Sequence, residues 1–336
     1  MSGPGSARAV AHPNIALAKY WGKRPFGHNL PAVPSLSVTL AGMCTTTAVR
    51  FDAALDADVL TLNGAPAAPG ALARATGLLD RVRAEAGTAA RAEVISDNDF
   101  PTSAGLASSA SAFAAMALAA RAALGLSIDA SAISDLARRT SVSAARSALG
   151  GFAALRAGVA GDEVLAAEPV APADHLDLRV VVAVTTEAAK DVSSTKGMQH
   201  TADTSPYYPA WVEDAPRLFA RIHAAVLARD LEALGIAAEA SALRMHASAV
   251  AAAPAVVYWS PATLGALATV RDLRARGVAA WSTIDAGPHV KVLTTAGDEA
   301  EVTRALRATA GVLRTLATHP GPGAALVGSG GSAGQP

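Results

Sequence analysis

The sequence predicts a protein of two domains, each combining helices with β-strands. The length of 336 residues suits two domains or one large domain. Both halves contain β-rich runs and helical patterns, as in residues 36–47 and 71–86 of the first half. The chain changes character at residues 170–177 (VAPADHLD), directly before the clearest buried strand. We therefore place a domain boundary at residue 175.

In the first half, strand and helix patterns follow one another. The pattern predicts a strand at 36–47, a hairpin at 59–64, a helix at 71–86, a short strand at 92–95 and a helix at 131–149. The hairpin rests on Asn63-Gly64, a dipeptide that readily adopts the positive φ angles of a tight turn. Gly150-Gly151 is expected to end the last of these helices.

In the second half, the apolar run LRVVVAVTT at 178–186 predicts a buried strand. The elements expected after it are a polar loop at 190–198, helices at 207–225, 230–253 and 263–276, a strand, turn and strand at 279–293, and a helix at 301–317. The remaining residues, 319–336, are rich in Gly, Ser and Pro, and this composition predicts a disordered tail.

Composition excludes several classes of function. Hydrophobic residues make up 51% and charged residues 17%, so the chain can bury a sizeable core. The formal net charge is zero, which argues against nucleic acid as the main partner. Cys44 is the single cysteine, so no intrachain disulfide forms, and a reducing cytoplasm is expected. The sequence has neither a signal-peptide core nor an uninterrupted apolar run of membrane-spanning length, so we expect no membrane partner.

The stretch from Asp97 to Gly125 is the first candidate for a binding site. Small and polar residues lead into a run of strong helix formers. Free backbone N–H groups at the positive end of a helix dipole can bind a phosphate. The competing interpretation is an ordinary helix start with serine caps, and the loop is neither a Walker A motif nor a dinucleotide-binding fingerprint.

Three further positions have a functional and a structural interpretation. Residues 19–24 (KYWGKR) place cations beside aromatic rings, which suits an anionic ligand or a solvated loop. Arg146 could bind a carboxylate or interact with a helix dipole. Asp285, before Ala-Gly-Pro, could be a catalytic carboxylate or a turn residue. The residues alone leave these alternatives open.

Taken together, four motifs resemble the diphosphomevalonate decarboxylase family of the GHMP kinase superfamily. They are residues 14–24 (NIALAKYWGKR), 98–111 (NDFPTSAGLASSAS), 190–199 (KDVSSTKGMQ) and 284–289 (IDAGPH). The motifs occur in the family's order and span nearly the whole chain. One departure is residues 140–147 (TSVSAARS), where Thr140 and Val142 replace two glycines and stiffen the backbone.

The resemblance implies an α+β protein with the GHMP kinase fold. Its N-terminal domain, residues 1–175, would be of the ribosomal protein S5 domain 2 type and would bind ATP. Its C-terminal domain, residues 176–318, would be ferredoxin-like, with the active site in the cleft between the two. The implied reaction converts mevalonate 5-diphosphate to isopentenyl diphosphate, with ATP and Mg²⁺ as cofactors. The resemblance also implies a cytoplasmic homodimer.

The resemblance also implies roles for individual residues. The catalytic set would be Asp285 as the base or orienting group for the 3-hydroxyl, with Lys19, Arg146 and Lys190. Substrate would be bound by Tyr20, Lys23, Ser141, Ser143, Arg146 and Ser194. ATP would be bound by Asn98, Pro101, Ser103, Gly105, Leu106, Ala107, Ser108 and Ser109. The motifs do not identify the Mg²⁺ ligands.

Other functions remain open at this point. One is a phosphomevalonate decarboxylase, and another is a small-molecule kinase that stops after phosphoryl transfer. A third, from a different class, is a non-catalytic protein of the same fold that binds a metabolite and regulates. Asp285, Lys19 and Arg146 occurring together favour the decarboxylase.

Overall fold

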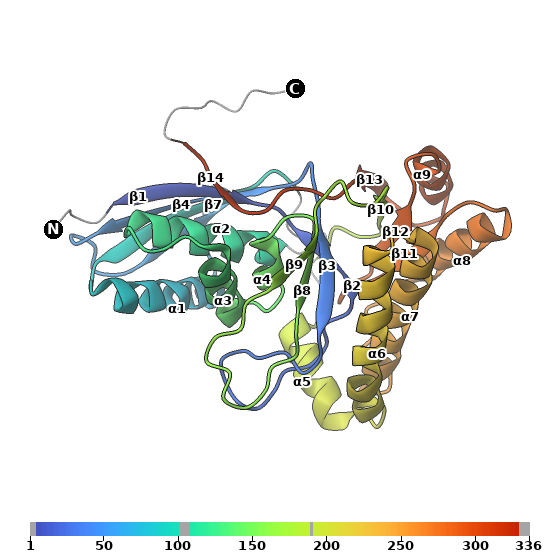
Figure 1. Cartoon of the computed structure of the whole chain (residues 1–336), viewed down its shortest axis with the longest axis horizontal. Coiled ribbons are helices and arrows are strands. Elements are labelled where there is room, and N and C mark those ends of the chain that lie inside the picture. Colours follow the sequence, from blue (N-terminus) through green and yellow to red (C-terminus); the bar gives the residue numbers. More distant parts are fainter. Residues whose placement is uncertain (1–4, 101–107, 189–190, 329–336) are drawn as a thin grey trace.

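The computed structural model describes residues 5–100, 108–188 and 191–328 (Figure 1). One sheet forms most of the first half, with strand order β14-β1-β4-β7-β5-β6. Its strands are β1 (Ser6–Ala11), β4 (Thr45–Asp52), β5 (Val59–Leu62), β6 (Ala65–Pro66), β7 (Arg91–Asn98) and β14 (Ala325–Leu326). Helices α1 (Pro69–Ala86), α2 (Ser108–Ala123) and α3 (Ala130–Thr140) lie on one side of this sheet.

A second, antiparallel sheet lies in the middle of the molecule, with strand order β2-β3-β8-β9. Its strands are β2 (Asn14–Ala18), β3 (Ser35–Thr39), β8 (Phe152–Leu155) and β9 (Glu168–Ala171). The short helix α4 (Ala144–Ser147) lies beside it. All five residues of β3 are buried, because both faces of this sheet are covered.

The second half contributes the third sheet, with strand order β11-β12-β10-β13. Its strands are β10 (Arg179–Val184), β11 (Trp281–Thr283), β12 (Val290–Thr294) and β13 (Arg314–Thr318). The helices of this half are α5 (Ser194–Thr204), α6 (Tyr208–Leu227), α7 (Leu231–Val250), α8 (Pro261–Ala275) and α9 (Glu299–Arg307). None of the described helices combines the length and the apolarity needed to cross a membrane.

One apolar core connects the second and third sheets. Leu36 and Val38 of β3 pack in the same cluster as Val180 and Val182 of β10, and residues of α6 and α7 complete it. The boundary that we place at residue 175 lies in the loop between β9 and β10. Burial of this shared core therefore holds the two halves of the chain against each other.

The expected helix at 131–149 and the expected strand at 36–47 are each divided into two elements. The helix stops at Thr140, because the backbone of Ser141 is extended, and it resumes as α4. The strand divides into β3 and β4, which belong to different sheets, and Gly42 has the positive φ of 69° that turns the chain between them.

Two predictions for the C-terminal end are wrong. The helix expected at 301–317 ends at Arg307, and residues 314–318 instead form β13, because this segment pairs with the edge of β10. The tail expected to be disordered from residue 319 is built into the fold as far as residue 328. Ala325 and Leu326 pair with β1, and the Gly151 N–H donates to the Gly321 carbonyl at 2.9 Å.

The tail packs backbone against backbone at Gly321, which gives a direct test of its contribution. A Cβ atom at Gly321 would lie 2.5 Å from the Ala41 nitrogen, so Gly321→Ala should push the tail away from the residues that follow β3. We expect the free energy of unfolding in urea to fall by about 1–3 kcal/mol, the usual range for overpacking. Gly328→Ala is the matched control, because a Cβ there meets nothing within 4 Å. Equal stability of the two variants would show that the tail contributes little.

Candidate active site

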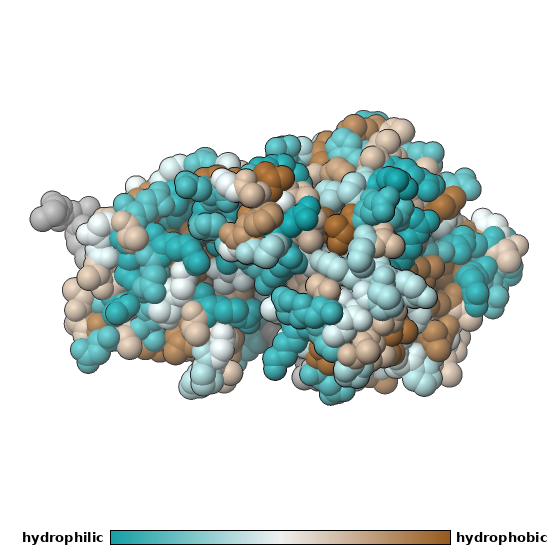
Figure 2. Space-filling view, turned by 90° about the horizontal axis from the view of Figure 1, so that it is seen from below, coloured by the Kyte–Doolittle hydropathy of each residue, from teal (hydrophilic) through white to brown (hydrophobic). Residues whose placement is uncertain are grey.

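A cleft of about 1150 Å³ lies between the two halves of the chain. Seen from below, the surface is indented between two lobes (Figure 2). The lining combines hydroxyl groups with four cationic side chains, Lys19, Lys23, Arg74 and Arg146. Asp191 and Asp285 are the acidic residues of this lining. The excess of cations favours an anionic ligand.

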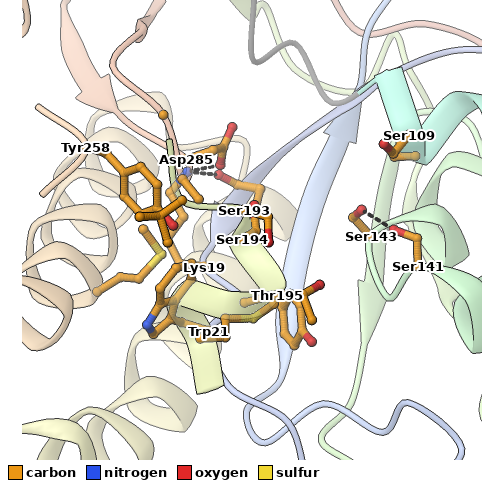
Figure 3. Close-up of a pocket in the computed structure, with 18 of the residues that line it drawn as sticks. Lys19, Trp21, Ser109, Ser141, Ser143, Ser193, Ser194, Thr195, Tyr258 and Asp285 are labelled. Carbon is orange, nitrogen blue, oxygen red and sulfur yellow. Dashed lines mark hydrogen bonds and ion pairs between the residues drawn. The ribbon is translucent and has the colours of Figure 1, made fainter. Parts of the chain in front are cut away.

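Asp285 lies between two lysine ammonium groups. Lys19, which directly follows β2, places its Nζ 2.6 Å from Asp285 Oδ1. Lys291, on β12, places its Nζ 3.2 Å from Asp285 Oδ2. Both lysine side chains are almost fully buried, whereas 28% of the Asp285 side chain is exposed. The carboxylate is therefore the member of this group that a ligand in the cleft can reach (Figure 3).

The two ammonium groups set the protonation state of Asp285. Burial would raise the pKa of the Asp285 carboxyl, but the charges of Lys19 and Lys291 outweigh it and hold the pKa well below its usual range. Burial lowers the pKa of Lys19 to about 8, although the Asp285 carboxylate acts in the opposite direction. At neutral pH the site thus holds an ionised carboxylate next to a lysine ammonium, and this ammonium loses its proton at a lower pH than an ordinary lysine.

Arg146 lies on the short helix α4 and is 1% exposed. Its Nη1 donates to Ser35 Oγ at 2.6 Å and its Nε donates to Ser37 Oγ at 2.9 Å. Within the described residues no carboxylate forms an ion pair with it. Burial lowers the pKa of Arg146 to about 10, so the group is still cationic at neutral pH. A buried guanidinium that is held by two hydroxyls and faces a cleft is suited to an anionic group of a ligand.

The opposite wall of the cleft is rich in hydroxyl groups. Ser141 and Ser143 lie within hydrogen-bond distance of each other, 3.2 Å between the two Oγ atoms, and face Lys19 and Asp285 across the cleft (Figure 3). Asn14 holds this segment by donating to the Ser143 carbonyl at 3.0 Å. Ser109, in the first turn of α2, lies on the same wall. Hydroxyls and a helix start together can bind phosphate oxygens.

The structure brings many of the predicted site residues into this one cleft. Those that line it are Lys19, Tyr20, Lys23, Ser108, Ser109, Ser141, Ser143, Arg146, Ser194 and Asp285. Asn98 is not part of the lining; its Oδ1 accepts from Thr45 Oγ1 at 2.5 Å. Pro101, Ser103, Gly105, Leu106, Ala107 and Lys190 lie outside the described residues, so their roles stay predictions.

Two charged residues of the site, Lys291 and Arg74, were not predicted from the sequence. Lys291 is a single lysine inside the apolar strand β12, six residues after Asp285, and its isolation in an apolar run is the pattern that could have identified it. Arg74 lies on α1, and its guanidinium is 5.2 Å from the centre of the Phe113 ring. Nothing in the helical pattern of α1 distinguishes Arg74 from a surface arginine.

The donor set suits a nucleotide phosphate better than a bare metal ion. In the described part of the chain, no group of three or more His, Cys, Asp or Glu side chains could hold a metal. Mg²⁺ usually keeps several water ligands and binds through substrate phosphates with few protein carboxylates. The hydroxyl and cationic groups that line this cleft therefore fit a magnesium ion that arrives with a phosphate ligand.

Comparison with known proteins identifies both halves of the chain. Residues 11–166 match the model of the diphosphomevalonate decarboxylase-like N-terminal domain. Residues 180–319 match the model of the mevalonate 5-diphosphate decarboxylase C-terminal domain. Diphosphomevalonate decarboxylase mvd1 of Aspergillus fumigatus is 34% identical, and the match covers 91% of this chain and 80% of the relative.

Solved structures agree with these matches. Mevalonate diphosphate decarboxylase from Staphylococcus aureus superposes with a TM-score of 0.91 at 35% identity, covering 96% of this chain and 98% of that one. The enzyme from Enterococcus faecalis superposes with a TM-score of 0.89 at 39% identity, covering 96% and 99%. A structure described as MDDEF in complex with MVAPP, AMPPCP and magnesium gives a TM-score of 0.90 at 40% identity, covering 96% and 99%. The chain, which has the two-domain fold of these enzymes, therefore belongs to the diphosphomevalonate decarboxylase family.

Proposed function

We propose that this protein decarboxylates mevalonate 5-diphosphate to isopentenyl diphosphate, with ATP converted to ADP and with release of phosphate and CO₂. The observation that carries the proposal is the position of Asp285. This carboxylate is held between two ammonium groups and faces a wall of hydroxyls and cations across one cleft. Family membership and this geometry support the same activity.

The two anionic ends of the substrate find different partners in the cleft. Lys23, Ser141 and Ser143, with Tyr20 and Ser194, hold the diphosphate. Burial raises the pKa of the Tyr20 hydroxyl strongly, so Tyr20 donates a hydrogen bond and stays neutral. Arg146 holds the substrate carboxylate, because its planar guanidinium can donate two parallel hydrogen bonds.

Asp285 acts on the 3-hydroxyl of the substrate. A tertiary alcohol is a weak nucleophile, and a carboxylate in hydrogen-bond reach orients it and receives its proton as the bond to phosphorus forms. Lys19 and Lys291 keep Asp285 ionised before this step. In the next step phosphate leaves with the electron pair of its C–O bond. The C–C bond to the carboxylate breaks, and its electron pair forms the double bond as CO₂ departs.

ATP and Mg²⁺ serve as the phosphoryl donor and its metal. The relative MDDEF was solved in complex with AMPPCP and magnesium, which supports the same pair here. Ser108 and Ser109 at the start of α2 hold the nucleotide phosphates, with further donors from residues 101–107 and from Lys190. MgATP supplies the γ-phosphoryl group and neutralises charge that develops on it.

The protein acts as a cytoplasmic homodimer in this proposal. Helix α7 exposes Ile236, Leu243 and Val250, at 47%, 41% and 43% of their surface. Residues seven apart lie on one face of a helix, so these side chains form an apolar stripe that a second copy could cover. The single cysteine, Cys44, is compatible with a reducing compartment.

Product stoichiometry tests the proposed function. Incubation with mevalonate diphosphate, ATP and Mg²⁺ should release ADP and CO₂ in equal amounts, measured in the same reaction. Formation of ADP without CO₂ would identify a kinase. Higher kcat/KM with mevalonate monophosphate than with the diphosphate would identify a phosphomevalonate decarboxylase.

Replacing the carboxylate tests the role of Asp285. Asp285→Asn keeps the size of the side chain and removes its charge, so turnover should fall by ~10²–10⁴, the usual contribution of a positioned base. ADP and CO₂ should decrease together in single-turnover measurements, while ATP still binds.

Asp58→Asn is the matched control for Asp285→Asn. It breaks another buried ion pair, with Arg83 at 2.9 Å, in a part of the fold that does not line the cleft. This control should unfold more easily and retain kcat/KM. Normal ADP formation with blocked CO₂ release in Asp285→Asn would assign Asp285 to the decarboxylation step instead.

The protonation of Lys19 predicts an alkaline limit to activity. Because the pKa of Lys19 lies at about 8, kcat/KM should fall as the pH rises through this value and the ammonium is lost. The positive charge of Lys291 contributes to this lowering of the pKa, so Lys291→Met should move the limit to higher pH. A kcat/KM that stays level up to about pH 10, near the ordinary lysine pKa, would contradict this assignment.

A further inference from the structure

The loop that carries Lys23 is closed on itself and has an unusual tip. We call residues 22–32 the Lys23 loop. The Arg24 N–H donates to the Leu30 carbonyl at 2.8 Å, and the Ala32 N–H donates to the Gly22 carbonyl at 3.0 Å. At the tip, His28 and Asn29 have φ angles of 52° and 54°. Two consecutive non-glycine residues in this region are unfavourable unless their surroundings hold them.

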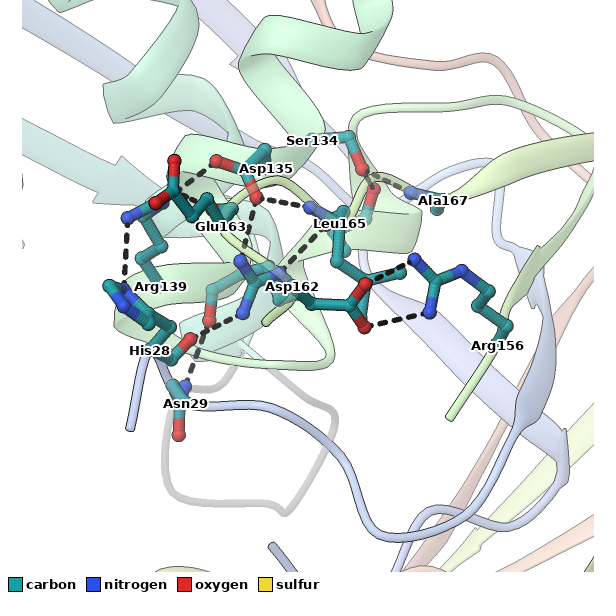
Figure 4. A network of polar contacts seen from close by, with 12 residues as sticks. His28, Asn29, Ser134, Asp135, Arg139, Arg156, Asp162, Glu163, Leu165 and Ala167 are labelled. Carbon is teal, nitrogen blue, oxygen red and sulfur yellow. Dashed lines mark hydrogen bonds and ion pairs between the residues drawn. The ribbon is translucent and has the colours of Figure 1, made fainter. Parts of the chain in front are cut away.

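The last turn of α3 holds the tip of the Lys23 loop (Figure 4). Arg138, which is fully buried, donates from Nη1 to the His28 carbonyl and from Nε to the Leu165 carbonyl, the latter at 2.7 Å. In return, Asn29 Nδ2 donates to the Arg138 carbonyl at 2.8 Å. Arg138 therefore connects α3 to two separate loops.

Asp135 holds the two arginines in place (Figure 4). Its Oδ1 accepts from Arg138 Nη2 at 2.6 Å and from the Leu165 N–H at 2.8 Å. Its Oδ2 accepts from Arg139 Nε at 2.7 Å. Burial would raise the pKa of Asp135, but these hydrogen bonds outweigh it and lower the pKa. The carboxylate is thus ionised and has donors on both oxygens.

A small apolar core lies next to these polar contacts. Leu30 of the Lys23 loop, Val142 and Leu165 belong to one buried cluster with Ala145, Leu155 and Ala167. Val142, one of the residues that replaces a glycine, is 3% exposed and belongs to this core. Residues 141–143, which include Ser141 and Ser143, follow α3 directly. The apolar core and the polar network therefore hold the same two parts of the chain, the Lys23 loop and the segment that carries Ser141 and Ser143.

We propose that Asp135 and Arg138 are positioning residues that hold Lys23 and the Ser141–Ser143 segment at a fixed spacing for the diphosphate of the substrate. Neither residue lines the cleft, so both act through the elements they connect. When the loops of a binding site are already ordered before the ligand arrives, the free energy of binding is not reduced by the cost of ordering them. The proposal rests on the proposed function for the identity of the substrate, but the anion site itself can be tested without turnover.

The effect of disturbing this network should be specific to the diphosphate. Lys23, Ser141 and Ser143 contact the end of the substrate that does not react, whereas Asp285 and Lys19 lie elsewhere and keep their own contacts. Loss of spacing should therefore raise the KM for mevalonate diphosphate and change kcat little. The KM for ATP should change less, because Ser108 and Ser109, the proposed phosphate contacts on α2, belong neither to the Lys23 loop nor to the Ser141–Ser143 segment.

The test uses Arg138→Lys and Asp135→Asn in the full chain. Arg138 contacts Leu165, His28 and Asp135 from three different nitrogens of its planar guanidinium. The donors of a lysine ammonium all lie on one nitrogen, which cannot reach these three separated partners at once. We expect the KM for mevalonate diphosphate to rise ~10- to 100-fold, since the loss of one charged hydrogen bond to a ligand lowers its affinity by roughly this factor. Inorganic pyrophosphate is the probe for binding alone, and its Kd from calorimetry should rise in parallel.

Two further variants separate positioning from general loss of structure. Arg83→Lys breaks a comparable buried arginine–aspartate pair outside the cleft and should lower the melting temperature without changing KM or Kd. Arg139→Lys changes a partly exposed position of the network and provides the test if a buried variant does not fold. In this variant the KM for mevalonate diphosphate and the pyrophosphate Kd should rise by a smaller factor.

Each outcome of these measurements decides for or against the proposal. An unchanged pyrophosphate Kd in a folded Arg138→Lys or Arg139→Lys variant would overturn it. So would equal rises in the KM for mevalonate diphosphate and for ATP. If the wild-type protein fails to release CO₂, the proposed function fails. The pyrophosphate Kd values still decide the positioning role in that case.

Discussion

The contact between Lys19 and Asp285 is the constraint on which the site depends. These residues are 266 positions apart, and their side chains meet at 2.6 Å only because β2 and the turn after β11 are packed into one body. The shared core of the second and third sheets provides that packing. Burial of apolar surface, which has no direction of its own, thus fixes the geometry of a directional charged pair.

The cleft has more buried positive charge than its own acids neutralise. Lys19, Lys291 and Arg146 are each nearly inaccessible to solvent, and Asp285 is the carboxylate beside them. Buried cations without full pairing lower the stability of the folded chain. A substrate with a diphosphate and a carboxylate brings negative charge to these cations. Binding therefore offsets part of the free energy that burying the cations costs the folded chain. This is the usual relation between stability and function at a preorganised site.

The segment 140–143 shows how a family pattern can change while its serines still line the cleft. Glycines at 140 and 142 would leave this segment free to adapt to a ligand. Here Val142 is buried in a small core, and Arg138 and Asp135 connect the neighbouring loops. A stiffer backbone is compatible with binding when the surrounding contacts already hold the required shape.

The sequence by itself determined those features that depend on neighbours along the chain. The hairpin at Asn63-Gly64 is confirmed, as are most helices, because turn chemistry and 3.6-residue periodicity are local properties. The four motifs also identified the family and several residues that line the cleft, including Asp285, whose local pattern alone favours a turn residue.

Only the tertiary structure decided the features that depend on distant partners. Arg146 meets Ser35 and Ser37, which lie 111 and 109 positions away, and Lys19 meets Asp285, which lies 266 positions away. The tail from residue 319 is polar and glycine-rich, yet it joins the sheet through β1, because backbone hydrogen bonding does not require a particular side chain. Local propensity does not predict such pairings, because the free energy that favours them comes from contacts between segments that are far apart in the sequence.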